Sequence, residues 1–143
     1  MNLEFLLDTN VLSELARPRP DPGVSAWLST QAPIRLAAIT LYELSRGVQH
    51  APVGRRRRFL EEWLAALLAA APEVVPFDGR AALVAASIDQ AARRAGRPIP
   101  DRDLFILATA RSQDLGLATR NLADFRGHGV SLYDPFADTR VPG

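Results

Sequence analysis

Five acidic or amide side chains in this sequence lie next to short apolar runs, at points where a strand would give way to a helix. Asp8 and Glu43 follow the first two runs, Asp103 precedes a longer one, and Asn121 and Asp124 follow the next. In open α/β sheets, ligands bind outside the carboxyl ends of the strands. In a parallel sheet, four of these residues should therefore gather at one edge. Asp103 joins them if its helix starts on the same side.

Carboxylates that gather in this way repel one another unless a cation lies between them. Sites built from oxygen ligands, without histidine or cysteine, select hard ions such as Mg²⁺ or Mn²⁺ over zinc. Such an ion neutralises charge on a phosphate and lowers the pKa of a bound water, which suits phosphodiester hydrolysis. The spacing therefore predicts a metal site around Asp8, Glu43 and Asp103.

Each of these residues also has a purely structural explanation, because short polar and acidic side chains are favoured in the first turns of helices. Asp8 stands where a helix cap is expected. Thr40 is a natural N-cap, and Glu43 three residues later completes a capping-box pattern. Asp101 or Asp103 could likewise cap the helix that follows them. The residue types alone leave both explanations open.

The elements that would position these side chains can be predicted from hydrophobic periodicity. Strands are expected at residues 5–7, 34–39, 74–75, 116–119 and 130–132. Helices are expected at 10–15, 24–28, 40–47, from 55 to just before Pro72, after 78, at 104–110, and for one turn at 120–125. Strands that alternate with helices give an α/β fold, with a mainly parallel central sheet flanked by helices on both faces.

Local signals sharpen some of these boundaries. Asp78 is expected to cap the helix that follows it, and Gly96 fits a left-handed C-terminal cap. Gly47 is expected near the end of its helix. The helix from Arg55 carries an apolar stripe that must pack on something. Its members are Phe59, Leu60, Trp63, Leu64, Leu67 and Leu68.

The composition fits one globular domain over residues 1–143, with 48% hydrophobic and 23% charged residues. There is no cysteine, which excludes thiolate chemistry and agrees with a cytoplasmic location. All 17 basic residues are arginine, so lysine-based phosphate loops and Schiff bases are excluded while bidentate phosphate recognition stays available. Neither a secretory signal nor a membrane-spanning stretch is expected.

In this order and spacing, four segments resemble the motifs of a PIN domain of the VapC/FitB-like toxin group. Shorter intermediate pieces fit as well, so the similarity extends over nearly the whole chain. No single motif is specific, but the ordered set is. The segments are residues 7–15, 42–47, 97–110 and 119–125.

The resemblance implies a PIN-like fold and a Mg²⁺- or Mn²⁺-dependent endoribonuclease that acts as the toxin of a type II toxin–antitoxin pair. Asp8, Glu43 and Asp103 fall on the family's metal-binding carboxylates. Asn121 stands where many members have aspartate, and Asp124 lies one helical turn further, so either could fill the fourth position. The implied partners are RNA, a small antitoxin protein and a second copy of the chain, with a higher toxin–antitoxin assembly also open.

Other polar residues near these motifs have expected supporting roles. Thr9, Asn10 and Thr119 are expected to orient ligands or water, and Arg120 to contact a phosphate. The four arginines at residues 55–58 could contact RNA or an acidic antitoxin, but a solvated helix start explains them equally well. The alternative from another functional class is a catalytically weak PIN-fold module that binds RNA or protein. The three intact carboxylates argue against this alternative, whereas the amide of Asn121 favours it mildly.

Overall fold

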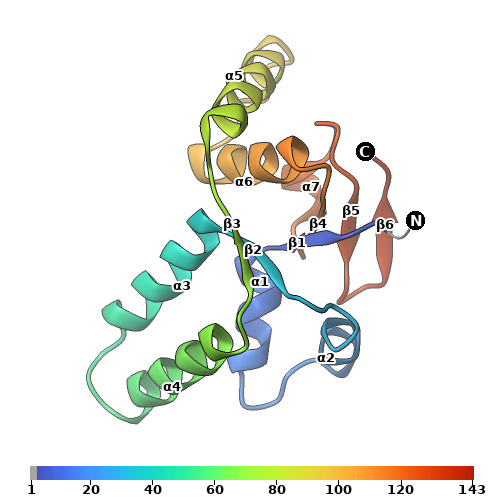
Figure 1. Ribbon diagram of the computed structural model, residues 1–143. Coiled ribbons are helices and arrows are strands. Elements are labelled where there is room, and N and C mark those ends of the chain that lie inside the picture. The colour runs from blue at the N-terminus through green and yellow to red at the C-terminus, as the bar shows by residue number, and fades with distance from the viewer. Residues whose placement is uncertain (1–2) are drawn as a thin grey trace.

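The computed structural model of the chain describes residues 3–143 and is organised around one six-stranded sheet (Figure 1). The strand order is β3-β2-β1-β4-β5-β6, in which the first five strands run parallel and β6 is antiparallel to β5. The strands are β1 (Phe5–Leu7), β2 (Arg35–Ala37), β3 (Glu73–Val75), β4 (Gly116–Ala118), β5 (Leu132–Asp134) and β6 (Thr139–Val141). The predicted α/β class with a mainly parallel sheet is confirmed.

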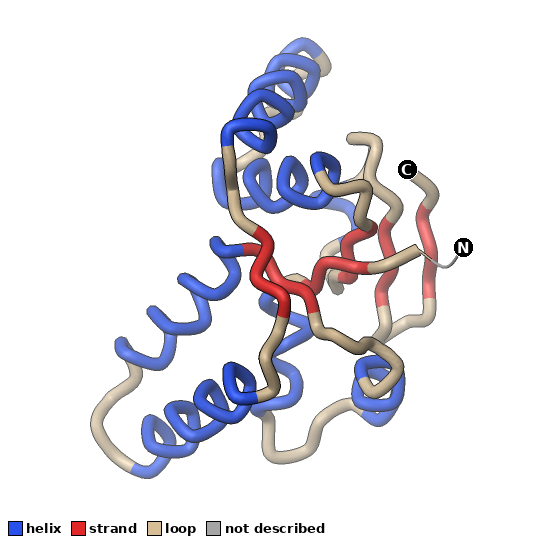
Figure 2. The backbone as a smooth tube through the Cα atoms, viewed as in Figure 1, coloured by secondary structure: helices blue, strands red, loops and turns tan. Residues whose placement is uncertain are grey.

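Helices cover both faces of the sheet, as Figure 2 shows. They are α1 (Thr9–Leu12), which continues as a 3₁₀ helix η1 (Ser13–Ala16), α2 (Pro22–Leu28), α3 (Ala38–His50), α4 (Arg55–Ala69), α5 (Gly79–Arg94), α6 (Asp101–Ser112) and α7 (Leu122–Phe125). Successive strand residues point to opposite faces. Leu6 of β1 therefore packs in a core with α5 and α6, while Phe5 and Leu7 pack in a second core with α1, α2 and α4.

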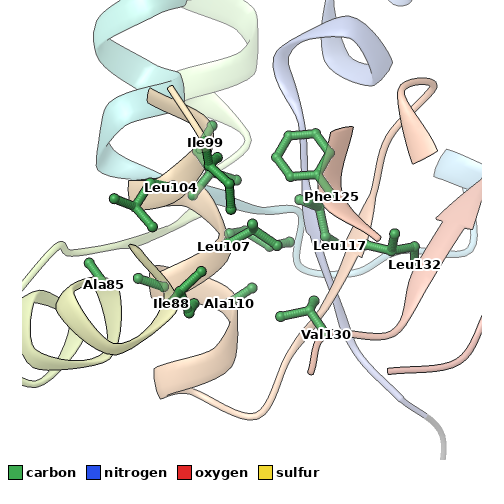
Figure 3. Close-up of a cluster of buried hydrophobic side chains, with 14 of the residues drawn as sticks. Ala85, Ile88, Ile99, Leu104, Leu107, Ala110, Leu117, Phe125, Val130 and Leu132 are labelled. Atoms are coloured by element: carbon green, nitrogen blue, oxygen red, sulfur yellow. The ribbon is translucent and has the colours of Figure 1, made fainter. Parts of the chain in front are cut away.

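The core under α5 and α6 fixes the direction of α6 (Figure 3). Ile88 of α5 and Leu107 of α6 belong to one buried cluster with Leu117 and Leu132 of the sheet, and all four side chains are almost fully buried. Burying an aliphatic side chain of this size stabilises the fold by about 1.5–3 kcal/mol. As its continuous apolar run predicts, α6 is buried on most sides, so its first turn has a fixed position.

The predicted caps around α5 are confirmed. The side chain of Asp78 accepts a hydrogen bond of 3.0 Å from the backbone N–H of Ala81. At the other end Gly96 has φ +71°, and the N–H of Arg97 donates to the carbonyl of Ala92 at 2.9 Å. A left-handed residue here is accessible to glycine at little cost. The chain therefore turns sharply and reaches α6 through residues 97–100.

The predicted capping box at Thr40 is wrong. Ala37 is the N-cap of α3, and Thr40 is the third residue of the helix and fully buried. Strand β2 ends at Ala37, so the helix begins earlier than the pattern indicates. Glu43 then lies beyond the first turn and has no capping role. Gly47 does not end the helix either, because α3 continues to His50.

Two other boundary predictions are also wrong. Asp101 and Asp103 lie in the first turn of α6, where Pro100 is the N-cap, so neither caps the helix. The last parallel strand is Leu132–Asp134 rather than 130–132, and the antiparallel β6 was not predicted. The side chain of Asp134 accepts from the N–H of Phe136 at 2.8 Å, which closes the turn that returns the chain as β6.

The apolar stripe of α4 is only partly covered. Leu67 is buried, but Phe59 and Leu68 are 44% and 46% exposed. The charged start of the same helix is partly engaged within the chain: Arg56 donates to the carbonyl of Ala16 at 3.2 Å, and Arg57 pairs with Glu61 at 3.4 Å. Within residues 3–143 no helix combines the length and apolar character needed to cross a membrane.

Candidate active site

Asp8 is the residue between the end of β1 and the start of α1. Figure 1 shows these two elements meeting at the carboxyl edge of the sheet. Asp8 caps α1 as expected, since Oδ1 accepts from the N–H of Thr9 at 2.8 Å. Its Oδ2 accepts from the hydroxyl of Thr119 at 2.8 Å and from Nδ2 of Asn10 at 3.3 Å. The residue is fully buried. Asp8 is thus a cap and also a buried carboxylate with a fixed orientation.

Glu43 reaches the same edge from α3. Its Oε1 accepts from the hydroxyl of Thr9 at 2.9 Å, which links α3 to the start of α1. Its Oε2 accepts from Nε of Arg102 at 2.7 Å. These contacts explain why a glutamate within the helix body points to the sheet edge. The contact between Thr9 and Glu43 also places the predicted supporting residue Thr9 beside a predicted ligand.

Asp103 comes to this edge in the first turn of α6, and Arg102 beside it connects the three acids. The guanidinium of Arg102 donates from Nη1 to Asp103 Oδ1 at 2.8 Å and from Nη2 to Asp8 Oδ1 at 2.7 Å. With the Nε bond to Glu43, each of its three nitrogens contacts a different carboxylate. The structure therefore brings Asp8, Glu43 and Asp103 together around one positive charge.

The surroundings of Arg102 favour its charged form on balance. Burial by itself lowers the pKa of the guanidinium, but the hydrogen bond to Glu43, the charge of Asp8 and the bond to Asp103 outweigh burial and raise this pKa above its ordinary value. Sequence reasoning missed Arg102 and chose Arg120 as the cation near the site. The sequence shows only that Arg102 directly precedes a predicted ligand, and this position does not indicate where its side chain points.

Arg120 points elsewhere. Its guanidinium lies over the ring of Phe136 at 4.5 Å, and its backbone N–H donates to Oδ1 of Asn10 at 3.1 Å. Asn10 in turn lies 3.4 Å from the hydroxyl of Thr119 through Nδ2. Asn10 and Thr119 therefore form a small polar network that joins the loop after β4 to Asp8.

The two candidates for the fourth position lie further out. Asn121 is exposed, and its backbone N–H donates to the hydroxyl of Thr119 at 3.1 Å. Asp124 is exposed in the first turn of α7 and lines a cleft of about 320 Å³ together with Asp103. Over the described part of the chain, neither side chain bonds to Asp8, Glu43 or Asp103.

The donor chemistry fits a hard divalent ion. Asp8, Glu43 and Asp103 offer carboxylate oxygens to one cationic group, and oxygen donors of this kind hold Mg²⁺ or Mn²⁺. In residues 3–143 as they stand, no three acidic or histidine side chains are arranged to ligate an ion directly. The reason is visible in the hydrogen bonds, since the guanidinium of Arg102 lies between the three acids.

Comparisons with known proteins agree with this architecture. The PIN domain family model matches residues 5–127. The chain is 37% identical to Toxin FitB of Neisseria gonorrhoeae over 94% of its own length and 99% of that protein. It is 36% identical to VapC ribonuclease Y4jK of Sinorhizobium fredii over 92% of its length and 97% of that protein.

Solved structures of toxin–antitoxin proteins are also similar to this chain. The crystal structure of FitAcB from Neisseria gonorrhoeae superposes with a TM-score of 0.85 at 37% identity, covering 92% of this chain and 98% of the other. VapBC-5 of Mycobacterium tuberculosis, described as a member of the VapBC family of toxin–antitoxin systems, gives a TM-score of 0.66 at 26% identity over 88% and 93%. By its sequence and its fold, the chain belongs to the VapC/FitB-like toxin family of PIN-domain proteins.

Proposed function

We propose that this chain is the toxin of a type II toxin–antitoxin pair and that it hydrolyses RNA phosphodiester bonds as a divalent-metal-dependent endoribonuclease. The observation that carries the proposal is the convergence of Asp8, Glu43 and Asp103, from three separate segments, on one positive charge. The name of one relative, Toxin FitB, supports the toxin role, and that of another, VapC ribonuclease Y4jK, supports the ribonuclease activity.

In this proposal Asp8, Glu43 and Asp103 hold Mg²⁺ or Mn²⁺, with Asp124 or Asn121 completing the site. When bound, such an ion neutralises charge that develops on the phosphate and lowers the pKa of a bound water. Hydroxyl and amide groups of the chain keep the acids in position: Thr9 holds Glu43, and Thr119 and Asn10 hold Asp8. A contact of Arg120 with an RNA phosphate stays a prediction, and it requires the guanidinium to leave the ring of Phe136.

A cleavage assay with purified protein tests this function. Wild type should cut RNA with Mg²⁺ or Mn²⁺ and lose that activity in EDTA. Asp8→Asn and Asp103→Asn should each lose more than about 100-fold, the upper range for removing an outer-shell partner of a metal ligand. Asp89→Asn is the matched control, because Asp89 pairs with Arg93 on α5 and, over the described residues, forms no hydrogen bond or ion pair with the site. Cleavage that persists in EDTA, or that both site variants retain, would overturn the proposal.

The alternative is a PIN-fold module that binds RNA or protein with little catalysis. Two observations favour it: Arg102 already neutralises part of the acidic cluster, and an amide stands at residue 121. The same assay discriminates the two functions if RNA binding is measured in parallel. If the protein binds RNA but does not cleave it with any divalent ion tested, the binding module is favoured over the nuclease.

Membership of this toxin family also suggests protein partners for the chain. We propose a small antitoxin and a second copy of the chain, located in the cytoplasm. The uncovered apolar residues of α4, Phe59 and Leu68, support a protein interface on that helix. Induced expression in bacteria should arrest growth, Asp8→Asn should relieve the arrest, and co-expression of the antitoxin should do the same.

A further inference from the structure

The guanidinium of Arg102 lies between the three carboxylates, where a metal-dependent site would hold its ion. Arg102 lies in the first turn of α6. Its guanidinium nitrogens donate to carboxylate oxygens of Glu43 at 2.7 Å, Asp8 at 2.7 Å and Asp103 at 2.8 Å. Its Nη2 also donates to the hydroxyl of Thr9 at 3.1 Å. A planar group with nitrogens on three sides can contact three carboxylates at once, which an ammonium group on a flexible stem matches poorly.

The charges around Arg102 explain why it is held there. Asp8 is fully buried, and a buried carboxylate without a partner is strongly unfavourable. Three carboxylates around one guanidinium still leave two negative charges in excess. The cluster therefore attracts a divalent cation even with Arg102 in place. The cation and the guanidinium cannot share the position, because they repel each other and need the same oxygen atoms.

We propose that Arg102 is a resident counter-ion of the carboxylate cluster: it positions Asp8, Glu43 and Asp103 in the metal-free protein and must leave before a divalent ion binds. Arg102 thereby sets the metal affinity of the site. This inference rests on the proposed metal-dependent function. The side chain of Arg102 is 33% exposed, so the guanidinium can move toward solvent without any displacement of α6.

A titration with Mn²⁺ followed by electron paramagnetic resonance, which reports the free ion, tests the inference on the full chain. Arg102→Met keeps the aliphatic stem and removes the charge. It should bind Mn²⁺ about tenfold or more tightly than wild type, because no cation has to be displaced. Arg93→Met is the matched control, since Arg93 pairs with Asp89 on the exposed side of α5, and its Mn²⁺ affinity should equal that of wild type.

Thermal unfolding gives a second readout. Without metal, Arg102→Met should melt below wild type, because three acids lose their shared counter-ion. Saturating Mn²⁺ should then raise its melting temperature more than that of wild type. Arg102→Lys covers the case in which Arg102→Met does not fold. Its single charge contacts fewer acids, so its Mn²⁺ affinity should lie between wild type and Arg102→Met.

Guanidinium itself serves as an independent probe. In metal-free Arg102→Ala, millimolar guanidinium chloride should raise the melting temperature relative to equal sodium chloride, and it should compete with Mn²⁺. Equal Mn²⁺ affinity in wild type, Arg102→Met and Arg102→Lys would overturn the inference. If none of the proteins binds Mn²⁺, the proposed metal function fails instead. Rescue by guanidinium would then still support Arg102 as the counter-ion, and its absence would overturn that role too.

Discussion

The hydroxyl of Thr119 donates a buried hydrogen bond of 2.8 Å to Oδ2 of Asp8, across 111 residues of sequence. The same hydroxyl accepts from the N–H of Asn121 at 3.1 Å, which fixes the direction of its proton. Thr119 follows β4 and Asp8 follows β1, and these strands are direct neighbours in the sheet. The position of a central acid in the candidate site is therefore set by a neighbouring strand.

Thr119→Val should lower the free energy of unfolding by about 1–3 kcal/mol, because it leaves a buried carboxylate oxygen with a weaker partner. The shape of the side chain is kept, so packing changes little. Urea unfolding of the metal-free protein measures the effect. Thr139→Val, which removes an exposed hydroxyl from β6, is the control and should be nearly neutral. Equal stability of the two variants would show that the bond to Asp8 contributes nothing.

Thr9→Val should impair RNA cleavage more than stability. The hydroxyl of Thr9 donates to Glu43 at 2.9 Å and is the only side-chain link between α1 and this acid over the described residues. Without it Glu43 can rotate away, and loss of such an outer partner lowers activity by about 10–100-fold. Initial cleavage rates at saturating Mg²⁺ test this. Thr9→Ser should retain most of the activity, and full activity in Thr9→Val would exclude the orienting role.

Much of the site could be predicted because its acids follow strands in a parallel sheet. Asp8 and Glu43 could be placed at one edge from the order of strands and helices alone. Arg102 could not. Adjacent residues on a helix point in different directions, so the sequence gives no reason for Arg102 to face the same point as Asp103. Its reach depends on the direction of α6, which the turn at Gly96 and the core around Leu107 determine.

The boundary of α3 shows a second limit. The local pattern at Thr40 and Glu43 predicts a capping box, and that preference is worth about 1 kcal/mol. Pairing of β2 with two neighbours, together with burial at Leu36 and Ala37, competes with it and starts the helix at Ala38. Which strand has neighbours on both sides is a property of the sheet order, and short local patterns do not contain it.

Thr40 itself gives a prediction, because its hydroxyl is buried and has no hydrogen-bond partner among the described residues. An unpaired buried hydroxyl is unfavourable by about 1–3 kcal/mol in mutational data. Thr40→Val replaces it with a methyl group of similar size and should raise the free energy of unfolding by about 1 kcal/mol. Thr40→Ser, which keeps the hydroxyl and loses a methyl group, should be destabilising. A destabilised Thr40→Val would mean that the hydroxyl has a partner after all.

Glycine is needed at residue 116 because the ring of Phe5 leaves no room for a side chain, and not because the backbone has an unusual conformation there. A Cβ atom at this position would lie 2.7 Å from Cδ1 and Cε1 of Phe5, closer than real contacts allow. The ring packs edge-on against Trp27 at 5.7 Å and cannot move away freely. Gly116→Ala should therefore lower the free energy of unfolding by about 1–3 kcal/mol, the usual range for overpacking a core.

Gly47→Ala is the matched control for Gly116→Ala. Gly47 lies inside α3, and a Cβ atom there would meet nothing within 4 Å. Alanine is the better helix residue, so this variant should gain up to about 1 kcal/mol. Chemical denaturation of both variants gives the comparison. A neutral Gly116→Ala would show that Phe5 can repack and that the close approach of β1 and β4 does not need glycine.

His128, which lies beside the candidate site, gives a prediction for how the stability of the fold depends on pH. It lines the cleft that holds Asp103 and Asp124, together with Arg97 and Arg126. Burial and then the positive charge of Arg111 lower the pKa of His128 below its ordinary value of 6.5. The folded state thus favours the neutral imidazole. Its contribution to stability is present above about pH 6.5 and is lost as the pH falls through the lowered pKa.

His128→Gln should therefore lose less stability than wild type between pH 7 and pH 5, measured by urea unfolding across that range. Arg111→Gln should raise the pKa of the His128 ring, followed by nuclear magnetic resonance, but not fully to 6.5, because burial is the larger cause. A ring that titrates at or above 6.5 in the folded wild type would contradict both expectations. The other charged groups that line the same cleft are Arg97, Arg126, Asp103 and Asp124. Because His128 and Asp103 line one cleft, a change of this titration on addition of RNA would report occupancy of that cleft.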